Sequence, residues 1–427
     1  MTTIAGLVLF ITFFIFLIIG LPIALAIILS SIITLLLILP FDVTIVTAAQ
    51  RMVTGIDDFT MLAIPLFVLA GIIMNNGGIA FRLVNFAKVL VGRLPGSLAH
   101  TNIVGNMLSG SSVAAAAAMG RIMGPMEKTQ GYKKEYSAAA NIASAPSGLL
   151  IPPSSLLIVY SLVSGGTSIA ALFIAGYIPG ILWGIACMIV AYVMAKKQGY
   201  KVSEKISWKD RLFLTLDALP SLFLIVVVIG GIVGGIFTAT EGAAVAVLYS
   251  VVLSLIYKSL KIKQLSNVIK ETAEISGMIL FLITASALFS LVMSYTGLPE
   301  AISNGIISMT DNPIALLLLI NVILLVIGTF MDITPAVLIF TPIFLPISEV
   351  LGLDPIHFGI IIAFNLCIGN ITPPVGSALF VGASVGGVRV ESVFKYLIPY
   401  FVALIILMLI ITFIPQLSLF LPKLLGL

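Results

Sequence analysis

The chain has 427 residues, of which 60% are hydrophobic and only 9% are charged, and its mean hydropathy is +1.24. Soluble domains carry about 25% charged residues, so the 21 Lys and Arg and 17 Asp and Glu residues are too few to cover a water-facing surface. This composition argues against a soluble enzyme, a nucleic-acid-binding protein and a disordered scaffold, despite the net charge of +4. The only cysteines (Cys187, Cys367) and histidines (His100, His357) are isolated, so neither a disulfide framework nor a zinc site is expected.

Runs without charge predict the membrane spans. A helix needs about 20 apolar residues to cross a bilayer, and residues 1–41 carry no charge. Gly20-Leu21-Pro22 divides this run, which predicts two short spans, because a cleaved signal peptide would require a basic start that the run lacks. Eight further spans bring the expected total to ten, at 59–76, 136–165, 169–195, 213–236, 240–257, 277–296, 355–385 and 393–421.

Two other apolar segments, 95–125 and 313–348, each break near the centre. The first breaks at Ser109-Gly110-Ser111-Ser112 and the second at Met331-Asp332-Ile333-Thr334-Pro335. Each half is short for a full crossing, so we interpret both segments as re-entrant helical hairpins that enter and leave on one side. Two ordinary spans in each segment are the alternative.

The basic residues indicate the orientation. Nineteen of the 21 Lys and Arg residues fall on one side of the predicted topology, which makes that side cytoplasmic by the positive-inside rule. Both termini then face the periplasm, the first hairpin enters from the cytoplasm and the second enters from outside. The expected cytoplasmic loops are 77–94, 126–135, 196–212, 258–276 and 386–395.

The chain contains an internal repeat. When residues 111–171 are shifted by 221 positions onto 332–392, seven Gly or Pro identities align without a gap, among them Pro152-Pro153 with Pro373-Pro374. Each half, 1–211 and 212–427, then holds five crossings and one hairpin. Five is an odd number, so the halves lie in opposite orientations. Inverted repeats with matched broken helices are typical of secondary transporters with a binding site at the midplane.

Four irregular segments recur in this repeat: the two hairpin tips and two breaks, at 144–155 and 369–377. Backbone that is not helical at membrane depth must be buried or line a water-filled cavity. Freed carbonyls together with Ser, Thr and Asn oxygens suit a sodium ion, and the N-termini of half-helices attract an anion. The alternative is that these small residues serve close helix packing.

Charged groups at depth are few. Asp332 stands at the second hairpin tip, and an acid within the membrane is a functional candidate; it can also act as the N-cap of the helix that follows. Arg121 is expected to extend its charged head to the cytoplasmic surface. We find no carboxylate pair or histidine relay for protons, and no phosphate-binding loop for ATP.

Four runs together resemble a known family: GNMLSGSSVAAAAAMGRIMGPMEKTQGY, ASAPSGLLIPPSSLLIVY, GTFMDITPAVLIFTPIFLPI and GNITPPVGSALFVGASVGG. They are similar to the large membrane subunit of the tripartite ATP-independent periplasmic (TRAP) transporters, the DctM-like family, and the resemblance covers almost the whole chain. It implies an all-α ion-transporter fold in which an outer scaffold surrounds a mobile transport domain. That domain would hold both hairpins and move as an elevator.

The resemblance also implies function and partners. It implies sodium-driven uptake of an organic acid across the bacterial inner membrane, with two or more sodium ions, and no enzymatic activity. Two partners are expected: a small four-helix membrane subunit, here a separate chain, and a periplasmic substrate-binding protein. Sialic acid is favoured slightly over a C4-dicarboxylate as the substrate, because a hydroxyl-rich lining suits a polyol.

The family's functional positions can be carried onto this sequence. One sodium site would lie between the first tip and the first break, and the other between the second tip and the second break. The expected sodium ligands are Ser109, Gly110, Ser112, Ala145, Gly148, Pro152, Gly328, Thr334, Gly369, Asn370 and Thr372. The expected substrate-binding residues are Ser111, Ser155, Asp332 and Ser377.

Three alternatives stay open. An uncoupled anion channel would pass the substrate without sodium, and a sodium/carboxylate symporter would work without a binding protein. A membrane enzyme would need a nucleophile, a base and an orienting acid together, and the single acid at depth argues against it.

Overall fold

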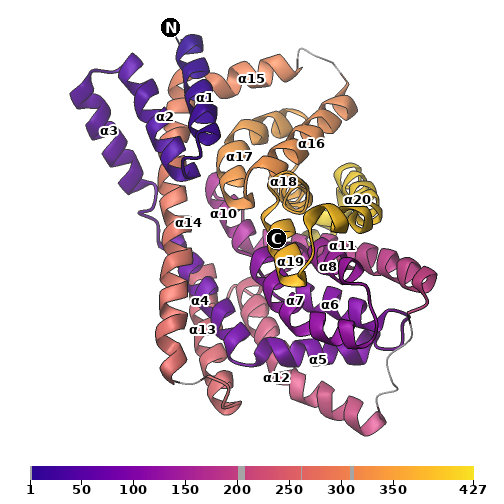
Figure 1. The fold of residues 1–427 in the computed structure, drawn as a ribbon. Coiled ribbons are helices and arrows are strands. Elements are labelled where there is room, and N and C mark those ends of the chain that lie inside the picture. Colours follow the sequence, from indigo (N-terminus) through magenta and orange to yellow (C-terminus); the bar gives the residue numbers. More distant parts are fainter. Residues whose placement is uncertain (1, 201–206, 261, 308–311) are drawn as a thin grey trace.

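The computed structural model describes residues 2–200, 207–260, 262–307 and 312–427. In this part of the chain all regular elements are helices, and no β-strand occurs (Figure 1). The loop residues Lys201, Lys205, Lys261 and Asp311, which entered the predicted topology, lie outside the described residues.

The first half begins with two short apolar helices, as predicted. They separate at Gly20, which has a positive φ of 88°, and at Pro22, which precedes the second helix. The helices of this half are α1 (Thr2–Ile18), α2 (Ile23–Ile38), α3 (Phe41–Thr54), η1 (Phe59–Leu62), α4 (Ala63–Asn76), α5 (Ile79–Val91), α6 (Ser97–Met107), α7 (Ser112–Thr129), α8 (Lys134–Ser144), α9 (Ser147–Leu150), α10 (Ser155–Val163) and α11 (Ile169–Gln198).

The second half repeats this order in its central part. A hairpin of two helices, α16 and α17, is followed by a broken helix, α18 and α19, as α6 and α7 are followed by α8 to α10. The helices of this half are α12 (Trp208–Val233), α13 (Ala239–Ile256), α14 (Ile262–Thr296), α15 (Leu298–Ile307), α16 (Pro313–Phe330), α17 (Ile333–Val350), α18 (Pro355–Gly369), α19 (Ser377–Gly386), α20 (Val390–Phe413) and α21 (Gln416–Leu424).

Many of the helices are built to cross a membrane. Within the described residues, eight are long and apolar enough to do so, and a ninth span results if the bent helix of α8 to α10, with its 49° angle, counts as one. The helices α1, α2, α18 and α19 are apolar but shorter. Because α16 and α17 each also reach the length of a span, the count of ten crossings and the re-entrant course of the hairpins stay predictions.

Some expected boundaries were wrong. The expected loops 77–94 and 258–276 are largely helical, as α5 and the first turns of α14, and α3 and α15 were not expected. Charged residues end an apolar run, but they do not end an amphipathic helix, because its apolar face can still be buried. In α5 this buried face includes Leu83 and Val84. The expected last span, 393–421, is too long, because α20 ends at Phe413 and Pro415 precedes α21.

Two groups of helices can be followed in Figure 1. The long α14 runs along one side of the molecule with α1, α2 and α4 beside it, and the hairpins and broken helices are packed together on the other side. Within that second group, α7 packs against α19 and α10 packs against α17. The return helix of each hairpin therefore contacts the broken helix of the other half.

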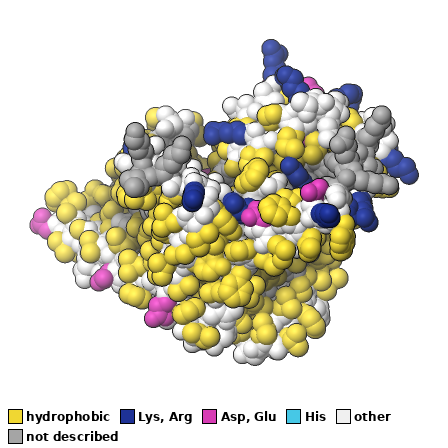
Figure 2. Space-filling model, turned by 90° about the horizontal axis from the view of Figure 1, so that it is seen from below, with side chains coloured by type: hydrophobic (Ala, Val, Ile, Leu, Met, Phe, Trp, Pro, Cys, Tyr) yellow, Lys and Arg dark blue, Asp and Glu magenta, His cyan; other side chains and the backbone are white. Residues whose placement is uncertain are grey.

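The outer surface suits a lipid environment. Large apolar side chains are exposed on many helices, for example Ile18 at 85%, Leu37 at 59% and Val226 at 63%. Figure 2 shows one face on which hydrophobic side chains form a broad area in the lower part of the view, with Lys and Arg side chains gathered mainly above it. Apolar areas of this extent on a protein surface mark a membrane or a partner.

Candidate substrate and ion site

The first hairpin tip is a short non-helical turn that rests on the first break. Gly110 has a positive φ of 68°, which glycine adopts without strain, and the Ser109 hydroxyl donates to the Ser111 carbonyl over 3.0 Å. Gly148, in the first break, lies against this tip. A Cβ atom added there would be 2.7 Å from the Asn106 carbonyl oxygen and 3.0 Å from the Gly110 nitrogen, so only glycine permits this approach.

The second tip approaches its break in the same way. A Cβ atom on Gly369 would overlap the backbone of Gly328, and one on Gly328 would be 3.1 Å from the Gly369 Cα atom. Gly148 and Gly369 correspond in the repeat, so both halves use a glycine to bring a hairpin against the following broken helix. The two glycines were matched by aligning one half of the sequence with the other.

Asparagines anchor each hairpin to its neighbouring helix. The Asn106 side-chain amide of α6 donates to the Ser144 hydroxyl of α8 over 2.8 Å, and the Asn365 amide of α18 donates to the Asn321 side chain of α16 over 2.7 Å. All four side chains are buried. Ser144 and Asn365 are equivalent in the repeat. Ser144 belongs to the predicted first break, but the three asparagines were not singled out, although polar side chains within apolar runs were the available signal.

A hydrogen-bond network joins the two halves at the tips. The Ser112 hydroxyl, on hairpin one, donates to the Asn370 side-chain oxygen over 3.0 Å. The Asn370 amide donates to the Ser377 hydroxyl over 2.7 Å and to an Asp332 carboxylate oxygen over 3.3 Å, and Ser377 donates to the same carboxylate oxygen over 2.9 Å. Residues predicted for separate sodium and substrate sites are therefore contiguous.

Asp332 occupies the N-cap position of α17, yet its side chain makes no cap hydrogen bond. Its carboxylate accepts from the second break instead, through Asn370 and Ser377. The carboxylate therefore lies beside several neutral oxygens, which is a ligand set that suits a hard cation such as sodium.

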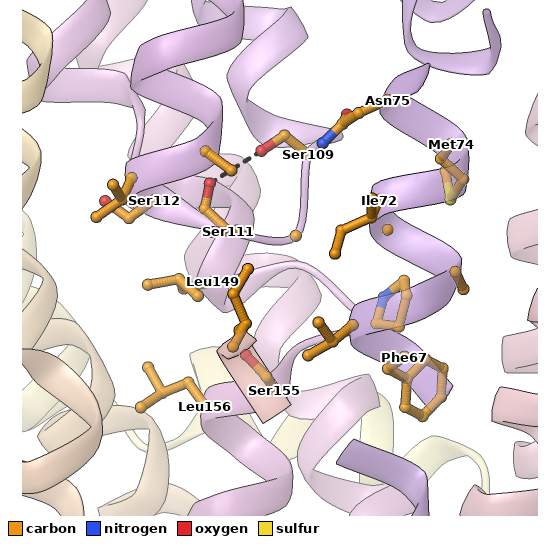
Figure 3. Close-up of a pocket in the computed structure, with 18 of the residues that line it drawn as sticks. Phe67, Ile72, Met74, Asn75, Ser109, Ser111, Ser112, Leu149, Ser155 and Leu156 are labelled. Carbon is orange, nitrogen blue, oxygen red and sulfur yellow. Dashed lines mark hydrogen bonds between the residues drawn. The ribbon is translucent and has the colours of Figure 1, made fainter. Parts of the chain in front are cut away.

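A cavity of about 310 Å³ lies between the tips and the long helices (Figure 3). Its lining combines hydroxyls from three irregular segments with apolar side chains, and Figure 3 shows Ser109, Ser111 and Ser155 on one side and Met74 and Asn75 of α4 on the other. The helices α7, α10 and α17 begin at this lining, so their N-terminal amides favour an anion there.

The structure brings most of the predicted residues to this cavity. Ser109, Gly110, Ser111, Ser112, Pro152, Ser155, Asp332, Thr334 and Asn370 line it. Six others do not line it: Ala145, Gly148, Gly328, Gly369 and Thr372, which lie in the packed breaks or beside them, and Ser377, which reaches it through Asn370 and Asp332. The expected substrate group is therefore only partly assembled around the cavity.

Two polar residues of the cavity were missed. Asn75, at the end of α4, and Glu271, on α14, both line it. Glu271 had been placed in a loop, because its charge ended the apolar run. No Lys or Arg is found among the lining residues, so an anionic group there would depend on the helix N-termini, on hydroxyl and amide donors and on bound cations.

The architecture and the cavity agree with one family. The family model described as "Tripartite ATP-independent periplasmic transporter, DctM component" matches residues 10–417. The chain belongs to this family of TRAP transporter large permeases. It is therefore a multi-pass membrane protein of a transport system, as the resemblance of the four runs suggested.

The relatives that are named for a substrate transport more than one kind of acid. The chain is 39% identical over 382 residues to the sialic acid TRAP transporter large permease SiaM of Vibrio cholerae, covering 88% of this chain and 89% of that one. It is 37% identical over 399 residues to the C4-dicarboxylate permease DctM of Pseudomonas aeruginosa, covering 92% and 93%. It is 54% identical over 422 residues, covering 98% and 97%, to a Salmonella typhimurium protein named YgiK.

Solved structures support the fold. The Alcanivorax borkumensis YdaH transporter superposes with a TM-score of 0.62 at 14% identity and covers 87% of this chain and 89% of that chain. Neisseria gonorrhoeae MtrF gives a TM-score of 0.58, also at 14% identity, and covers 86% and 84%. These similarities describe the arrangement of helices alone.

Proposed function

We propose that this permease carries an organic acid together with sodium ions across the bacterial inner membrane. The observation that carries the proposal is the network of Ser112, Asn370, Asp332 and Ser377, which joins both hairpin tips beside a cavity. Its carboxylate and neutral oxygens suit sodium, and three helix N-termini suit a carboxylate. Neither ligand alone uses all of these groups.

The repeat suggests how the two ions and the substrate move together. The contacts between α7 and α19 and between α10 and α17 tie both hairpins and both broken helices into one body. We propose that this body is the transport domain and that α4 and α14 belong to the scaffold. An elevator movement would then carry the cavity along α4 and α14.

Two residues of the cavity suggest the side of the membrane to which it opens in this structure. Asn75 lies at the end of α4, and Glu271 lies on the early turns of α14; both positions are near loops that the basic residues assign to the cytoplasm. We propose that this is the inward-facing arrangement, with both termini in the periplasm.

The family supplies the expected partners. We propose that a separate small four-helix membrane subunit and a periplasmic binding protein complete the transporter, as the tripartite description implies. The substrate class is an organic acid, and SiaM and DctM, which are named for sialic acid and C4-dicarboxylates, are the relatives that suggest candidates.

Uptake by reconstituted proteoliposomes tests the proposal. Sialic acid and succinate are supplied in turn, with the small subunit and the matching binding protein, in sodium or in choline. Uptake that requires sodium and the binding protein supports the proposal. Uptake of either acid in choline would instead indicate an uncoupled channel, and sodium-dependent uptake without the binding protein would indicate a simple symporter.

A further inference from the structure

A second cavity, of about 480 Å³, lies at the base of hairpin one, away from its tip. Its walls come from α6, α7, α8 and α19, and it shares no lining residue with the central cavity. Gly124 of α7 keeps part of it open, because a Cβ atom added there would meet no atom within 4 Å. The proposed transport cycle assigns no role to this space.

The floor of the second cavity is polar and buried. Asn102 and Glu127 are each 1% exposed, Tyr132 is 6% exposed and Ser137 is 9% exposed. Among the described residues, the Oε1 atom of Glu127 and the hydroxyl of Tyr132 have no hydrogen-bond partner. A buried carboxylate oxygen without a donor is costly, so a molecule that brings an O–H or N–H group to Glu127 gains a hydrogen bond there.

The mouth of the same cavity is basic. The side chains of Arg121, Lys128 and Lys134 are exposed and line it. In the described part of the chain, none of them lies within ion-pair distance of Glu127. Three like charges around a concave opening raise the local concentration of anions. Arg121, which was expected to extend to the membrane surface, thus lines the mouth of a cavity.

We propose that this cavity binds a small organic anion that also carries a hydroxyl or ammonium group. The anionic end would contact the three bases at the mouth, and the donor end would reach the Glu127 carboxylate on the floor. A simple inorganic anion would contact only the three bases at the mouth. A metal cation would contact only Glu127 on the floor, and the bases at the mouth would repel it.

Binding here would join parts of both repeats. The lining residues of α7 and α8 belong to the first half, and Gly382, Val385 and Gly386 of α19 belong to the second. On the proposed topology this end of hairpin one faces the cytoplasm. A cytoplasmic acid held between α7 and α19 would therefore contact both halves of the proposed transport domain.

The protonation of Glu127 gives the site a pH dependence. Glu127 lies in the last turn of α7, in a segment assigned to a cytoplasmic loop, and burial raises its pKa to about 7. Hydrogen bonds from the side chains of Ser137 and Asn102 oppose this rise in the pKa of Glu127. The titratable groups near it are Tyr132, Tyr136 and Tyr400, and the three bases line the same cavity; α6 and α19 contribute no charged lining residue. Burial also raises the pKa of Tyr132, to about 12. Binding should therefore strengthen as the pH rises from about 6 to about 8 and Glu127 ionises.

Equilibrium dialysis of the purified permease tests the proposal. The probe is radiolabelled gluconate, with butyrate as the acid that lacks hydroxyls, in sodium-free choline buffer at a pH of about 8. We expect saturable binding of gluconate that butyrate does not displace. Glu127→Gln should weaken it about fivefold, because a hydrogen bond to an ion is stronger than one to an amide, and Lys128→Glu should weaken it about tenfold.

Matched variants separate this site from its surroundings. Glu135→Gln and Lys133→Glu change neighbouring residues that do not line the cavity, and Asp332→Asn changes the central site; all three should bind gluconate as the wild type does. Gly124→Leu fills the open space and should abolish binding even if Glu127→Gln fails to fold. Absence of saturable binding, equal binding of butyrate, or unchanged binding in Gly124→Leu would overturn the proposal.

Discussion

At the scale of single residues, the contacts of Asp332 distinguish a helix-capping role from a role in the site at the second tip. The sequence allowed both an N-cap and a site residue. In the structure the carboxylate accepts hydrogen bonds from Asn370 and Ser377, and it makes no cap hydrogen bond. Asp354 offers a direct contrast, because its side chain caps α18 by accepting from the Ile356 amide over 2.8 Å.

Asp332→Asn should therefore impair transport without unfolding the protein. Asparagine keeps the size and an acceptor oxygen but removes the charge that attracts sodium. We expect sodium-dependent uptake to fall about tenfold or more, at normal expression. Asp354→Asn should stay within about twofold of the wild type, because Asn caps a helix nearly as well as Asp. Equal uptake by both variants would remove Asp332 from the site.

Thr372 tests the contribution of neutral oxygens. Its hydroxyl donates to the Ile368 carbonyl over 2.7 Å, which leaves its lone pairs to face a cation. Thr372→Val keeps the branched shape, and we expect it to raise the sodium concentration for half-maximal uptake about fivefold. Thr215→Val removes a similar hydroxyl near the start of α12, which donates to the Arg211 carbonyl over 2.8 Å, and it should leave the curve unchanged. A Thr372→Val curve that matches the wild type argues against a side-chain ligand.

The sequence identified the residues of the irregular segments but not those that face them. Ser112, Asn370, Asp332 and Ser377 stood out because Gly and Pro interrupt apolar runs beside them, and the structure brings all four together. Asn75 and Glu271 lie on regular helices, and only the packing of α4 and α14 turns them towards the cavity. The sequence does not reveal which face of α4 or α14 is turned towards the cavity.

At the scale of helices, close backbone contacts hold the hairpins in place. Gly369→Ala would press a methyl group against the backbone of Gly328, so α16 and α18 would have to separate. We expect a destabilisation of about 1–3 kcal/mol, seen as a lower thermal unfolding midpoint and reduced uptake. Gly277→Ala in α14 meets no atom within 4 Å and should be neutral or slightly stabilising. A Gly369→Ala protein with wild-type stability would contradict this packing.

Helix positions followed from the sequence better than helix ends did. Apolar runs predicted the spans, because burial in lipid requires them, and the breaks at Gly20 and at Gly165-Gly166 appear as expected. The apolar runs gave no information on helices that extend beyond them, such as α14, which is 35 residues long. Amphipathic helices such as α5 also carry enough charge to resemble loops.

At the scale of the whole molecule, the proposed opposite orientation of the two halves predicts which residues face each side of the membrane. Single cysteines are placed in a variant that lacks the two native ones, Cys187 and Cys367, which are both buried and free. Cysteines at Lys197 and Lys270 should react with a membrane-impermeant thiol reagent only from the cytoplasmic side. Cysteines at Asp57 and Glu300 should react only from the periplasmic side. Labelling of Glu300Cys from the cytoplasm would contradict opposite orientations of the two halves.

The central claim is that the cavity between the tips couples sodium to the movement of an organic acid. The most direct test is accumulation in proteoliposomes that contain the permease, its small subunit and the binding protein, with an inward sodium gradient and no membrane potential. The account predicts that the internal concentration of the acid rises above the external one and falls back when the gradient is collapsed. An acid that only equilibrates, at the same rate with and without the gradient, would contradict the account.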